Sequence, residues 1–458
     1  MPSNDFASLL LPPHLVENLR GLGYSQMTPI QAQALPPILD GADVIAQSKT
    51  GSGKTAAFGI GVLTSLNPRF FGTQALVLCP TRELADQVAK ELRRLARSLQ
   101  NIKILTLCGG TAIGPQFASL EHGAHIIVGT PGRVTKHLDK GSLDLQGLKT
   151  LVLDEADRML DMGFYDQIAE IARFIPKRRQ TLLFSATYTP AIRELSRNFQ
   201  SNPVEITVES VHADSEIEQY FYEVDHKQRR RALSALLKNF KPESAVLFCN
   251  TKQLCDEVAD ALNAQGFYAQ TLHGDMEQRD RDLVLLKFSN RSCPYLVATD
   301  VAARGLDIKD LAAVVNVDVA FDPDVHIHRI GRTGRAGQKG LALSLCSPAE
   351  VQRANAIETL LGRPLHWRDL PPSNDNETPE PPRMVTLNIG GGKRDKLRPG
   401  DILGALTGDA GLPGASIGKI DIGDQQTYVA VERAIAQKAV KRLQSGKIKG
   451  RSYRVRIV

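Results

Sequence analysis

Short apolar runs alternate with helical patterns along the first half of the chain. The helical stretches lie between the runs, as at Glu83–Leu95. Alternation of this kind predicts a parallel, doubly wound sheet covered by helices. The strands that we predict are Gln74–Cys79, Ile102–Leu107, His125–Gly129, Thr150–Leu153 and Thr181–Phe184.

The pattern loosens near Pro203–Ser215 and then restarts. A second α/β lobe is therefore predicted in tandem with the first. We place the two lobes at residues 1–206 and 214–368. The second set of predicted strands is Ala245–Cys249, Ala269–Leu272, Tyr295–Ala298, Ala313–Val317 and Leu341–Leu345.

A proline-rich segment ends the lobe pattern. Residues 371–382, PPSNDNETPEPP, contain five prolines and nothing to bury. This composition predicts a semi-rigid linker, which we place at 369–383. Twelve residues in an extended polyproline form reach about 37 Å, so the rest of the chain could work at a distance from the lobes.

The remaining residues, 384–458, predict a small βαββαβ domain. This order is typical of an RNA-recognition motif. The predicted strands are Met384–Ile389, Ser416–Ile422, Thr427–Glu432 and Tyr453–Val458, and the predicted helices are Pro399–Leu406 and Arg433–Leu443.

Composition narrows the class of protein. The chain has 458 residues, of which 42% are hydrophobic and 23% charged, as expected of a soluble protein with two or three domains. Apolar stretches long enough to span a bilayer are missing, and the N-terminus does not resemble a secretory signal. The six scattered cysteines favour reduced core residues. We therefore expect a cytoplasmic monomer that makes no membrane contact.

Charge is concentrated at the C-terminal end. From Arg383 onward the chain has 15 Lys and Arg against 6 Asp and Glu, a net charge of +9, whereas the whole chain carries +6. A basic module on a nearly neutral body indicates a polyanion partner, and nucleic acid is the first candidate.

A glycine-rich loop follows the apolar run at residues 43–46. Its glycines let backbone N–H groups approach phosphates, and a helix N-terminus after the loop favours anions. Lys54 would neutralise β- and γ-phosphate oxygens, and Thr55 would bind Mg²⁺. Ser48 stands where the strict phosphate-loop pattern has its first glycine, and a plain turn before a helix is the alternative. The candidate phosphate-binding residues are Ser48, Lys49, Thr50, Gly51, Ser52, Gly53, Lys54 and Thr55.

Two carboxylates end the buried run Leu151–Leu153. The C-terminal ends of strands are where α/β sheets place ligands. Asp154 would hold the Mg²⁺ shell, and Glu155 would orient and deprotonate the attacking water. An acidic first turn of a helix is the alternative. With the phosphate loop, the pair predicts hydrolysis of a nucleoside triphosphate.

The chain resembles the DEAD-box RNA helicases, whose motifs occur in order over about 365 residues. The resemblance implies two RecA-like lobes and ATP as the nucleotide. The segment GYSQMTPIQ, residues 23–31, resembles the family's Q motif. By that resemblance Gln31 would bind the adenine edge, and Phe6 would stack on the ring.

Other first-lobe motifs resemble the family's RNA-binding motifs and the motif that links ATP binding to unwinding. The segments at residues 80–85, 109–110 and 130–133 imply contacts with an RNA sugar-phosphate strand. Ser185-Ala186-Thr187 resembles the motif that couples ATP state to unwinding. The implied RNA-binding residues are Arg82, Gly110, Thr130 and Arg133, and the implied coupling residues are Ser185 and Thr187.

The second lobe resembles the family in its remaining motifs. Asp307 would bind the ATP ribose, and His328 would join the coupling network. Arg332 and Arg335 would be arginine fingers. Because these residues lie on another lobe than Lys54 and Glu155, the resemblance implies closure of a cleft for hydrolysis and local unwinding of short duplexes. The implied RNA contacts here are Arg281, Thr299 and Arg304.

The C-terminal module resembles that of bacterial family members directed to 23S rRNA. The resemblance implies binding to a hairpin near the peptidyl-transferase centre and a role in assembly of the large (50S) ribosomal subunit. The first signature strand has no aromatic residue, so binding through basic loops and edges is expected rather than base stacking. The candidate RNA contacts are Lys393, Arg394, Lys396, Lys419, Tyr428, Lys447 and Arg451.

Three alternatives accompany this interpretation. The tail could be a nonspecific basic anchor on a general RNA-stimulated helicase. The chain could be a DNA-directed motor, against which the Q motif and the RNA-recognition pattern argue. It could be an assembly factor with a vestigial ATPase, against which the intact Lys54 and Glu155 argue.

Overall fold

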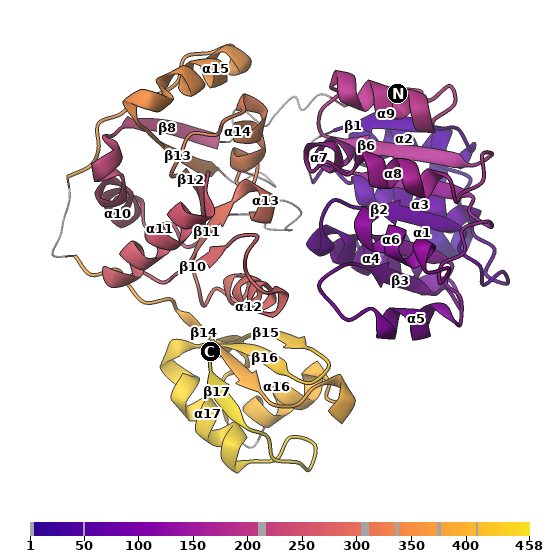
Figure 1. Ribbon diagram of the computed structural model, residues 1–458. Helices are drawn as coiled ribbons and strands as arrows, with labels where there is room; N and C mark the ends of the chain where they lie inside the picture. Colours follow the sequence, from indigo (N-terminus) through magenta and orange to yellow (C-terminus); the bar gives the residue numbers. More distant parts are fainter. Residues whose placement is uncertain are drawn as a thin grey trace. The chain divides into compact units, whose positions relative to one another are not determined.

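The computed structural model describes residues 4–48, 51–208, 217–303, 311–334, 339–372, 377–408 and 411–458. The described residues form two compact units, the first ending at residue 208 and the second beginning at 217. The second unit contains a lobe of its own and a small C-terminal domain (Figure 1).

The first unit is built on a seven-stranded sheet with the order β3-β4-β2-β5-β6-β1-β7, and its paired strands run parallel. The strands are β1 (Val44–Gln47), β2 (Ala75–Leu78), β3 (Ile104–Leu107), β4 (Ile126–Gly129), β5 (Thr150–Asp154), β6 (Gln180–Ser185) and β7 (Val204–Thr207). The helices are α1 (Pro13–Gly21), α2 (Pro29–Leu39), α3 (Lys54–Ser65), α4 (Arg82–Leu95), α5 (Gly114–Leu120), α6 (Pro131–Asp139), α7 (Ala156–Asp161), α8 (Tyr165–Ala172) and α9 (Pro190–Phe199).

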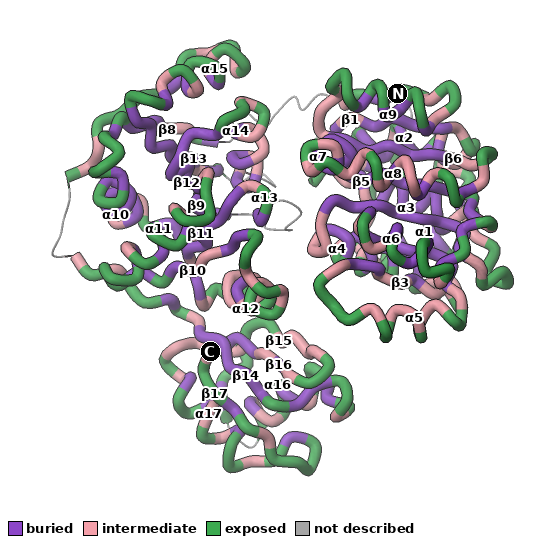
Figure 2. The backbone as a smooth tube through the Cα atoms, viewed as in Figure 1, coloured by how far each residue is buried: buried purple, intermediate pink, exposed green. Residues whose placement is uncertain are grey.

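Continuous apolar runs explain the central strands of this sheet. All residues of β2, β4 and β5 are buried, as expected of strands covered on both faces (Figure 2). Two hydrophobic clusters account for the two faces, one containing Val77 and the other Leu76. Helix α4 buries one stripe of apolar residues, and the Thr81 hydroxyl caps it by accepting from Leu84 N–H.

The second unit contains a six-stranded sheet with the order β10-β11-β9-β12-β13-β8, whose paired strands are also parallel. Its strands are β8 (Ile217–Glu223), β9 (Ala245–Cys249), β10 (Ala269–Leu272), β11 (Tyr295–Thr299), β12 (Ala313–Asn316) and β13 (Gly340–Cys346). Its helices are α10 (Arg229–Phe240), α11 (Lys252–Ala264), α12 (Gln278–Ser289), α13 (Asp300–Ala303), α14 (Pro323–Ile330) and α15 (Val351–Leu361). The prediction of two doubly wound α/β lobes is confirmed.

The C-terminal domain is a four-stranded antiparallel sheet with the order β15-β16-β14-β17. Its strands are β14 (Met384–Ile389), β15 (Ile417–Ile422), β16 (Thr427–Glu432) and β17 (Val455–Ile457), and its helices are α16 (Pro399–Thr407) and α17 (Ala436–Ser445). The predicted βαββαβ order is confirmed. Helix α17 begins three residues later than predicted, because Arg433–Ile435 forms a 3-10 turn.

The described linker residues lie against the second lobe. We predicted instead a spacer with nothing to bury. Glu377 pairs with Lys241 at 2.7 Å. Residues 377–383 line a cavity of about 740 Å³ together with residues of the second lobe and of the C-terminal domain. The ion pair between Glu377 and Lys241, the residue that follows α10, is a contact that the proline content alone did not indicate.

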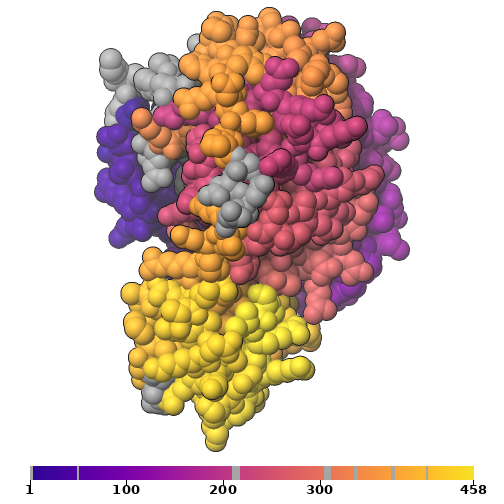
Figure 3. Space-filling model, turned by 90° about the vertical axis from the view of Figure 1, so that its left-hand side faces the viewer, coloured from indigo at the N-terminus to yellow at the C-terminus, as the bar shows by residue number. Residues whose placement is uncertain are grey.

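The outer face of the C-terminal sheet also contacts the second lobe. Thr386 in the middle of β14 is fully buried, and its hydroxyl contacts Ser292 Oγ at 2.7 Å and accepts from Asn290 Nδ2 at 3.2 Å. Ala430, on the neighbouring strand opposite Thr386, is buried as well. Figure 3 shows the C-terminal domain adjoining the second lobe and the linker. The part of this face around Thr386 is therefore covered by the loop between α12 and β11.

All six cysteines are buried, as predicted for core residues. Among the described helices, none is long and apolar enough to cross a membrane.

Candidate nucleotide and RNA sites

The phosphate loop joins β1 to α3. Gly51 and Gly53 have φ values of +85° and +99°, which L-residues rarely adopt. Lys54 is buried at the start of α3, and its Nζ donates to the carbonyl of Ser48 at 2.7 Å. The hydroxyls of Ser48 and Ser52 lie 2.8 Å apart. The Lys54 side chain therefore lies along the loop and reaches the carbonyl of Ser48. Lys49 and Thr50 lie outside the described residues.

Gln31 fixes the far end of this loop. Its Nε2 donates to Gly53 O at 3.1 Å, and its Oε1 accepts from Thr28 N–H at 2.9 Å in a capping box at the start of α2. A Cβ on Gly53 would lie 2.5 Å from Gln31 Nε2, so a glycine is required there. Gln31 therefore lies against the phosphate loop, where a nucleotide-binding role remains a prediction.

Phe6 is part of the first-lobe core. It is 2% exposed, and its ring meets Tyr24 edge-on with a centroid separation of 6.2 Å. The predicted stacking on adenine needs an accessible ring face, and the structure shows Phe6 packed rather than open.

Asp154 and Glu155 lie at the C-terminal end of β5, at the edge where the phosphate loop leaves β1. Burial raises the pKa of Asp154 to about 7, Lys54 opposes this shift, and Glu155 adds to it. Glu155 has φ +51°, a left-handed conformation that costs energy in a non-glycine residue. Its carboxylate is buried and lies 3.4 Å from Arg158 Nη1 without a hydrogen bond. Strain and an unsatisfied buried oxygen are features of functional sites.

The residues present fit Mg²⁺ held together with a nucleotide. Asp154, Glu155 and Asp157 bring like charges together, and a cation beside Asp154 would relieve their repulsion. Among the described residues, no group of three or more His, Cys, Asp or Glu could hold a metal alone. Mg²⁺ commonly takes one or two protein ligands and fills the rest from phosphates and water. The half-buried Thr55 and the buried Asp154 would therefore suffice.

Asp157 is a site residue that sequence reasoning missed. Its Oδ2 accepts from the backbone N–H of Ala186 and of Thr187, both at 3.1 Å, and from Thr187 Oγ1 at 3.2 Å. The buried Ser185 Oγ has no hydrogen-bond partner among the described residues. Asp157 therefore connects the carboxylate pair directly to the predicted coupling segment. The last letter of D-E-A-D was the available signal, but its partner lies about thirty residues away.

The predicted RNA residues of the first lobe lie together at the C-terminal ends of β2, β3 and β4. Gly110, with φ +74°, packs so closely on Arg82 that a Cβ would lie 1.5 Å from its guanidinium. Thr130 precedes α6, and Arg133 follows on its first turn. Burial, and to a smaller extent the neighbouring Arg82, lowers the pKa of Arg133. Adjacent guanidinium groups form an anion site suited to phosphate.

In the second lobe, Thr299 is buried at the C-terminal end of β11, and Arg281 on α12 donates to His273 O at 3.3 Å. His328 lies on α14, and Arg332 follows this helix and is buried. Arg304, Asp307 and Arg335 lie outside the described residues.

Arg329 is a second residue that sequence reasoning missed. It is 2% exposed and makes a bidentate pair with Asp300, both distances being 2.7 Å. It also donates to Asn250 Oδ1 and to the carbonyl of Asp318, both at 2.8 Å. Arg329 therefore joins the ends of β9, β11 and β12 to the helix that carries His328. An arginine next to the predicted coupling histidine was the only signal in the sequence.

The C-terminal domain presents two basic loops side by side, residues 390–398 and 446–454. Lys449 Nζ donates to Lys396 O at 2.9 Å, and Arg451 lies 3.7 Å from Asp395. Tyr453 fills the space beside Gly391, where a Cβ would lie 2.2 Å from its ring. These contacts hold the two loops next to each other. Their exposed basic residues are Lys393, Arg394, Lys396, Arg398, Lys447, Lys449, Arg451 and Arg454.

Two predicted RNA contacts lie apart from these loops. Lys419 on β15 donates to Ser289 Oγ of the second lobe at 3.1 Å and pairs with Asp421 at 3.2 Å. Tyr428 is half-buried on β16, and its hydroxyl donates to Gln426 Oε1 at 2.6 Å. The structure therefore gives Lys419 a place at the contact between domains, because β15 lies next to the α12 end.

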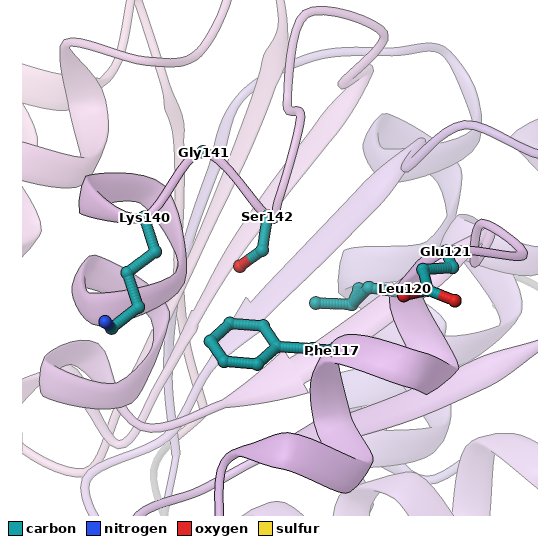
Figure 4. A pocket seen from close by; sticks show the side chains of 6 residues that line it. All are labelled: Phe117, Leu120, Glu121, Lys140, Gly141 and Ser142. Carbon is teal, nitrogen blue, oxygen red and sulfur yellow. The ribbon is translucent and has the colours of Figure 1, made fainter.

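A separate surface pocket of about 610 Å³ lies in the first lobe (Figure 4). Its lining contains none of the residues predicted to bind ATP, so it is distinct from the phosphate loop. The lining residues are Phe117, Leu120, Glu121, Lys140, Gly141 and Ser142.

Family comparisons agree with this geometry. Residues 28–195 match the DEAD/DEAH box helicase family, residues 228–337 match the helicase conserved C-terminal domain, and residues 386–457 match the DbpA RNA binding domain. The chain therefore belongs to the DEAD-box ATP-dependent RNA helicases, in the group that carries a DbpA RNA binding domain. It is an RNA helicase with ATPase activity.

Individual relatives support the same assignment. The chain is 58% identical to the ATP-dependent RNA helicase DbpA of Escherichia coli K12 over 98% of each chain. It is 43% identical to the DEAD-box ATP-dependent RNA helicase CshA of Geobacillus kaustophilus over 81% of this chain and 79% of that one. Among solved structures, S. cerevisiae Dbp5 bound to RNA and ADP BeF3 matches with a TM-score of 0.74 at 32% identity, covering 80% of this chain and 96% of that one.

Proposed function

We propose that this helicase locally unwinds short duplexes within 23S rRNA and takes part in 50S subunit assembly. Its C-terminal domain would direct it to a hairpin near the peptidyl-transferase centre. The observation that carries this proposal is the pair of adjoining basic loops on a domain whose sheet face is partly covered. The chain would act as a cytoplasmic monomer.

The chemistry proposed for the first lobe is ATP hydrolysis. Lys54 would bind β- and γ-phosphate oxygens, while Glu155 would take a proton from water as its oxygen attacks the γ-phosphorus and ADP leaves. Mg²⁺, held by Thr55 and Asp154, would neutralise phosphate charge when bound. Gln31 would contact the adenine, and residues 48–55 the phosphates, whereas the buried Phe6 would have to leave its packing against Tyr24 to stack on the ring.

The second lobe would complete the reaction. Arg332 and Arg335 would stabilise the charge that develops on the transferred phosphoryl group, and such arginines are worth about 10³–10⁵ in rate. Asp307 would bind the ribose. The residues that would couple the nucleotide state to RNA binding are Ser185, Thr187 and His328. The buried Asp157 holds the segment of Thr187, and the buried Arg329 holds the helix that carries His328.

The RNA strand would be held mainly through its backbone, which gives little sequence preference. In the first lobe the contacts would be Arg82, Gly110, Thr130 and Arg133. In the second lobe they would be Arg281, Thr299 and Arg304.

Hairpin recognition would use the two basic loops rather than stacking across the sheet. Thr386 and Ala430, at the middle of the sheet face, are covered by the second lobe, so bases cannot lie there while this contact holds. Tyr428 is the one aromatic side chain on the described part of that face, and it lies toward the end where the basic loops meet. Lys419 would support docking more than RNA binding.

A general RNA helicase with a nonspecific basic tail is the second candidate. Both candidates predict RNA-stimulated ATP hydrolysis, and they differ in whether one RNA is preferred. The test measures hydrolysis by the full chain and by residues 1–370, each with a peptidyl-transferase-centre rRNA fragment and with generic RNA.

We expect the rRNA fragment to stimulate the full chain far more than generic RNA does, and the shortened chain to lose only that advantage. Equal stimulation of both proteins by both RNAs would remove the rRNA assignment and leave a general helicase. A shortened chain with no activity on either RNA is tested further with a full chain whose loop residues Lys393, Arg394, Lys396 and Lys447 are changed to serine.

A further inference from the structure

One uncharged side chain in the first lobe joins the residues expected to grip RNA. Gln116, on α5, accepts at its Oε1 from Arg133 Nη1 at 2.8 Å and contacts His137 Nε2 at 2.9 Å. Its Nε2 donates to Cys108 O at 3.2 Å and to Thr111 Oγ1 at 3.3 Å. All four partners lie on the loop after β3 or on α6. The amide therefore ties the loop that carries Gly110 to the helix that carries Arg133.

Arg133 is held without losing its charge. Its other terminal nitrogen, Nη2, donates to Thr111 O at 2.9 Å, so both of its described partners are neutral oxygens. Within the described part of the chain, no carboxylate pairs with Arg133. A guanidinium has five N–H donors, and two are used here. The remaining donors and the full positive charge stay available for an anion.

His137 fixes the orientation of the amide. The ring is fully buried, and burial together with the nearby Arg133 lowers its pKa, so the imidazole is neutral. Its Nε2 faces the Gln116 oxygen, which can only accept, so Nε2 carries a hydrogen. Its Nδ1 lies 2.8 Å from Ser142 Oγ, whose hydroxyl donates to the His137 carbonyl at 3.0 Å. Phe117 packs edge-on against the ring at 5.1 Å. Ser142 and Phe117 are both seen at the edge of the pocket in Figure 4.

We propose that Gln116 is a positioning residue for RNA binding. It sets the side-chain conformation of Arg133 and its distance from the loop that carries Gly110, so that Arg133 meets one backbone phosphate. This inference rests on the proposed function, in which Arg133 and Gly110 contact RNA. Replacement of Gln116 should therefore weaken RNA binding through Arg133 while the maximal rate of hydrolysis at saturating RNA stays within about threefold, because placement of a distant group affects binding first.

The test uses the full chain and an oligouridylate as generic RNA. Gln116→Leu should raise the RNA concentration for half-maximal ATPase stimulation about tenfold, the size of one charge-assisted hydrogen bond. Gln146→Leu is the control, because the Gln146 side chain donates to Phe174 O on an exposed part of the same lobe. Circular dichroism and thermal unfolding establish that each variant is folded.

Salt dependence separates a positioning role from a general effect on the loop. The slope of log affinity against log salt should fall by about 0.7, the value for one single-strand phosphate contact. Gln116→Glu provides a second variant, since its carboxylate still accepts from Arg133 but compensates the charge, and the same fall is expected. An unchanged slope in both variants would overturn the proposal, because the phosphate contact would then be intact.

A double variant distinguishes this proposal from the proposed function. If Gln116 acts through Arg133, Gln116→Leu with Arg133→Leu should bind RNA no more weakly than Arg133→Leu alone. Additive losses would overturn the positioning role and leave Arg133 as an RNA contact. Unchanged RNA binding in Arg133→Leu would instead overturn the RNA role of Arg133, and the role of Gln116 with it.

Discussion

Asp157 Oδ2 accepts hydrogen bonds from both the backbone N–H and the hydroxyl of Thr187, at 3.1 and 3.2 Å. The carboxylate end of β5 and the segment after β6 therefore form one hydrogen-bonded unit. We propose that a shift of the carboxylate pair in response to ATP would be transmitted to Thr187 through these bonds.

We expect Asp157→Asn to reduce unwinding about tenfold more than ATP hydrolysis. An amide NH₂ in place of one carboxylate oxygen leaves a buried N–H unsatisfied, which costs about 1–3 kcal/mol. The measurement is duplexes unwound per ATP consumed. Asp161→Asn, exposed on the same helix, is the control, and an unchanged ratio in Asp157→Asn would show that these bonds do not couple the two activities.

Glu155→Gln should lower ATP hydrolysis at least a hundredfold while ATP and RNA remain bound, because the amide cannot take the proton of the attacking water. Single-turnover hydrolysis and RNA binding with ATP measure the two effects separately. Glu17→Gln, exposed in the same lobe, should behave as the unchanged protein. Near-normal turnover in Glu155→Gln would remove Glu155 from the reaction.

Gly110→Ala should weaken RNA binding. The new methyl group would overlap the Arg82 guanidinium, and φ +74° is strained for alanine. Gly114→Ala is a matched control in the same segment, since no atom lies within 4 Å of the position of its Cβ. Fluorescence anisotropy with a labelled RNA gives the RNA affinity of each variant. Equal affinities for the two variants would show that RNA binding does not require the position of the Arg82 side chain beside Gly110.

His326 should make the second lobe lose stability in acid. Burial lowers its pKa from 6.5 to about 3, with Arg329 contributing, and neither ring nitrogen has a hydrogen-bond partner among the described residues. The folded lobe favours the neutral ring, so this stability is present above pH 6.5 and is lost as pH falls from 6.5 toward 3. At pH 5 the loss is about 2 kcal/mol.

Trp367 reports this loss directly. It is the single tryptophan of the chain, and it packs on Phe221, which in turn contacts the His326 ring. Urea unfolding followed by tryptophan fluorescence should show a smaller loss between pH 7 and pH 5 in His326→Leu than in the unchanged protein. The exposed His226 serves as the control in His226→Leu, and parallel pH profiles for all three proteins would contradict the assignment.

The inner strands and the two nucleotide motifs could be predicted because each is a contiguous pattern. Strands β7 and β8 were missed, since both are edge strands with exposed polar positions and no continuous apolar run. Asp157, Arg329 and Gln116 could not be predicted as site residues, because their partners come from segments far along the chain. The burial of Thr386 depends likewise on Ser292, which nothing in the local pattern of β14 indicates.

The most direct test is the rate of ATP-dependent unwinding of one short duplex, either alone or joined to the peptidyl-transferase-centre hairpin. The account predicts at least about tenfold faster unwinding of the joined duplex, equivalent to about 1.4 kcal/mol. Changing Lys393, Arg394, Lys396 and Lys447 to serine should return that rate to the rate of the free duplex. Equal rates on both substrates by the unchanged protein would contradict the account.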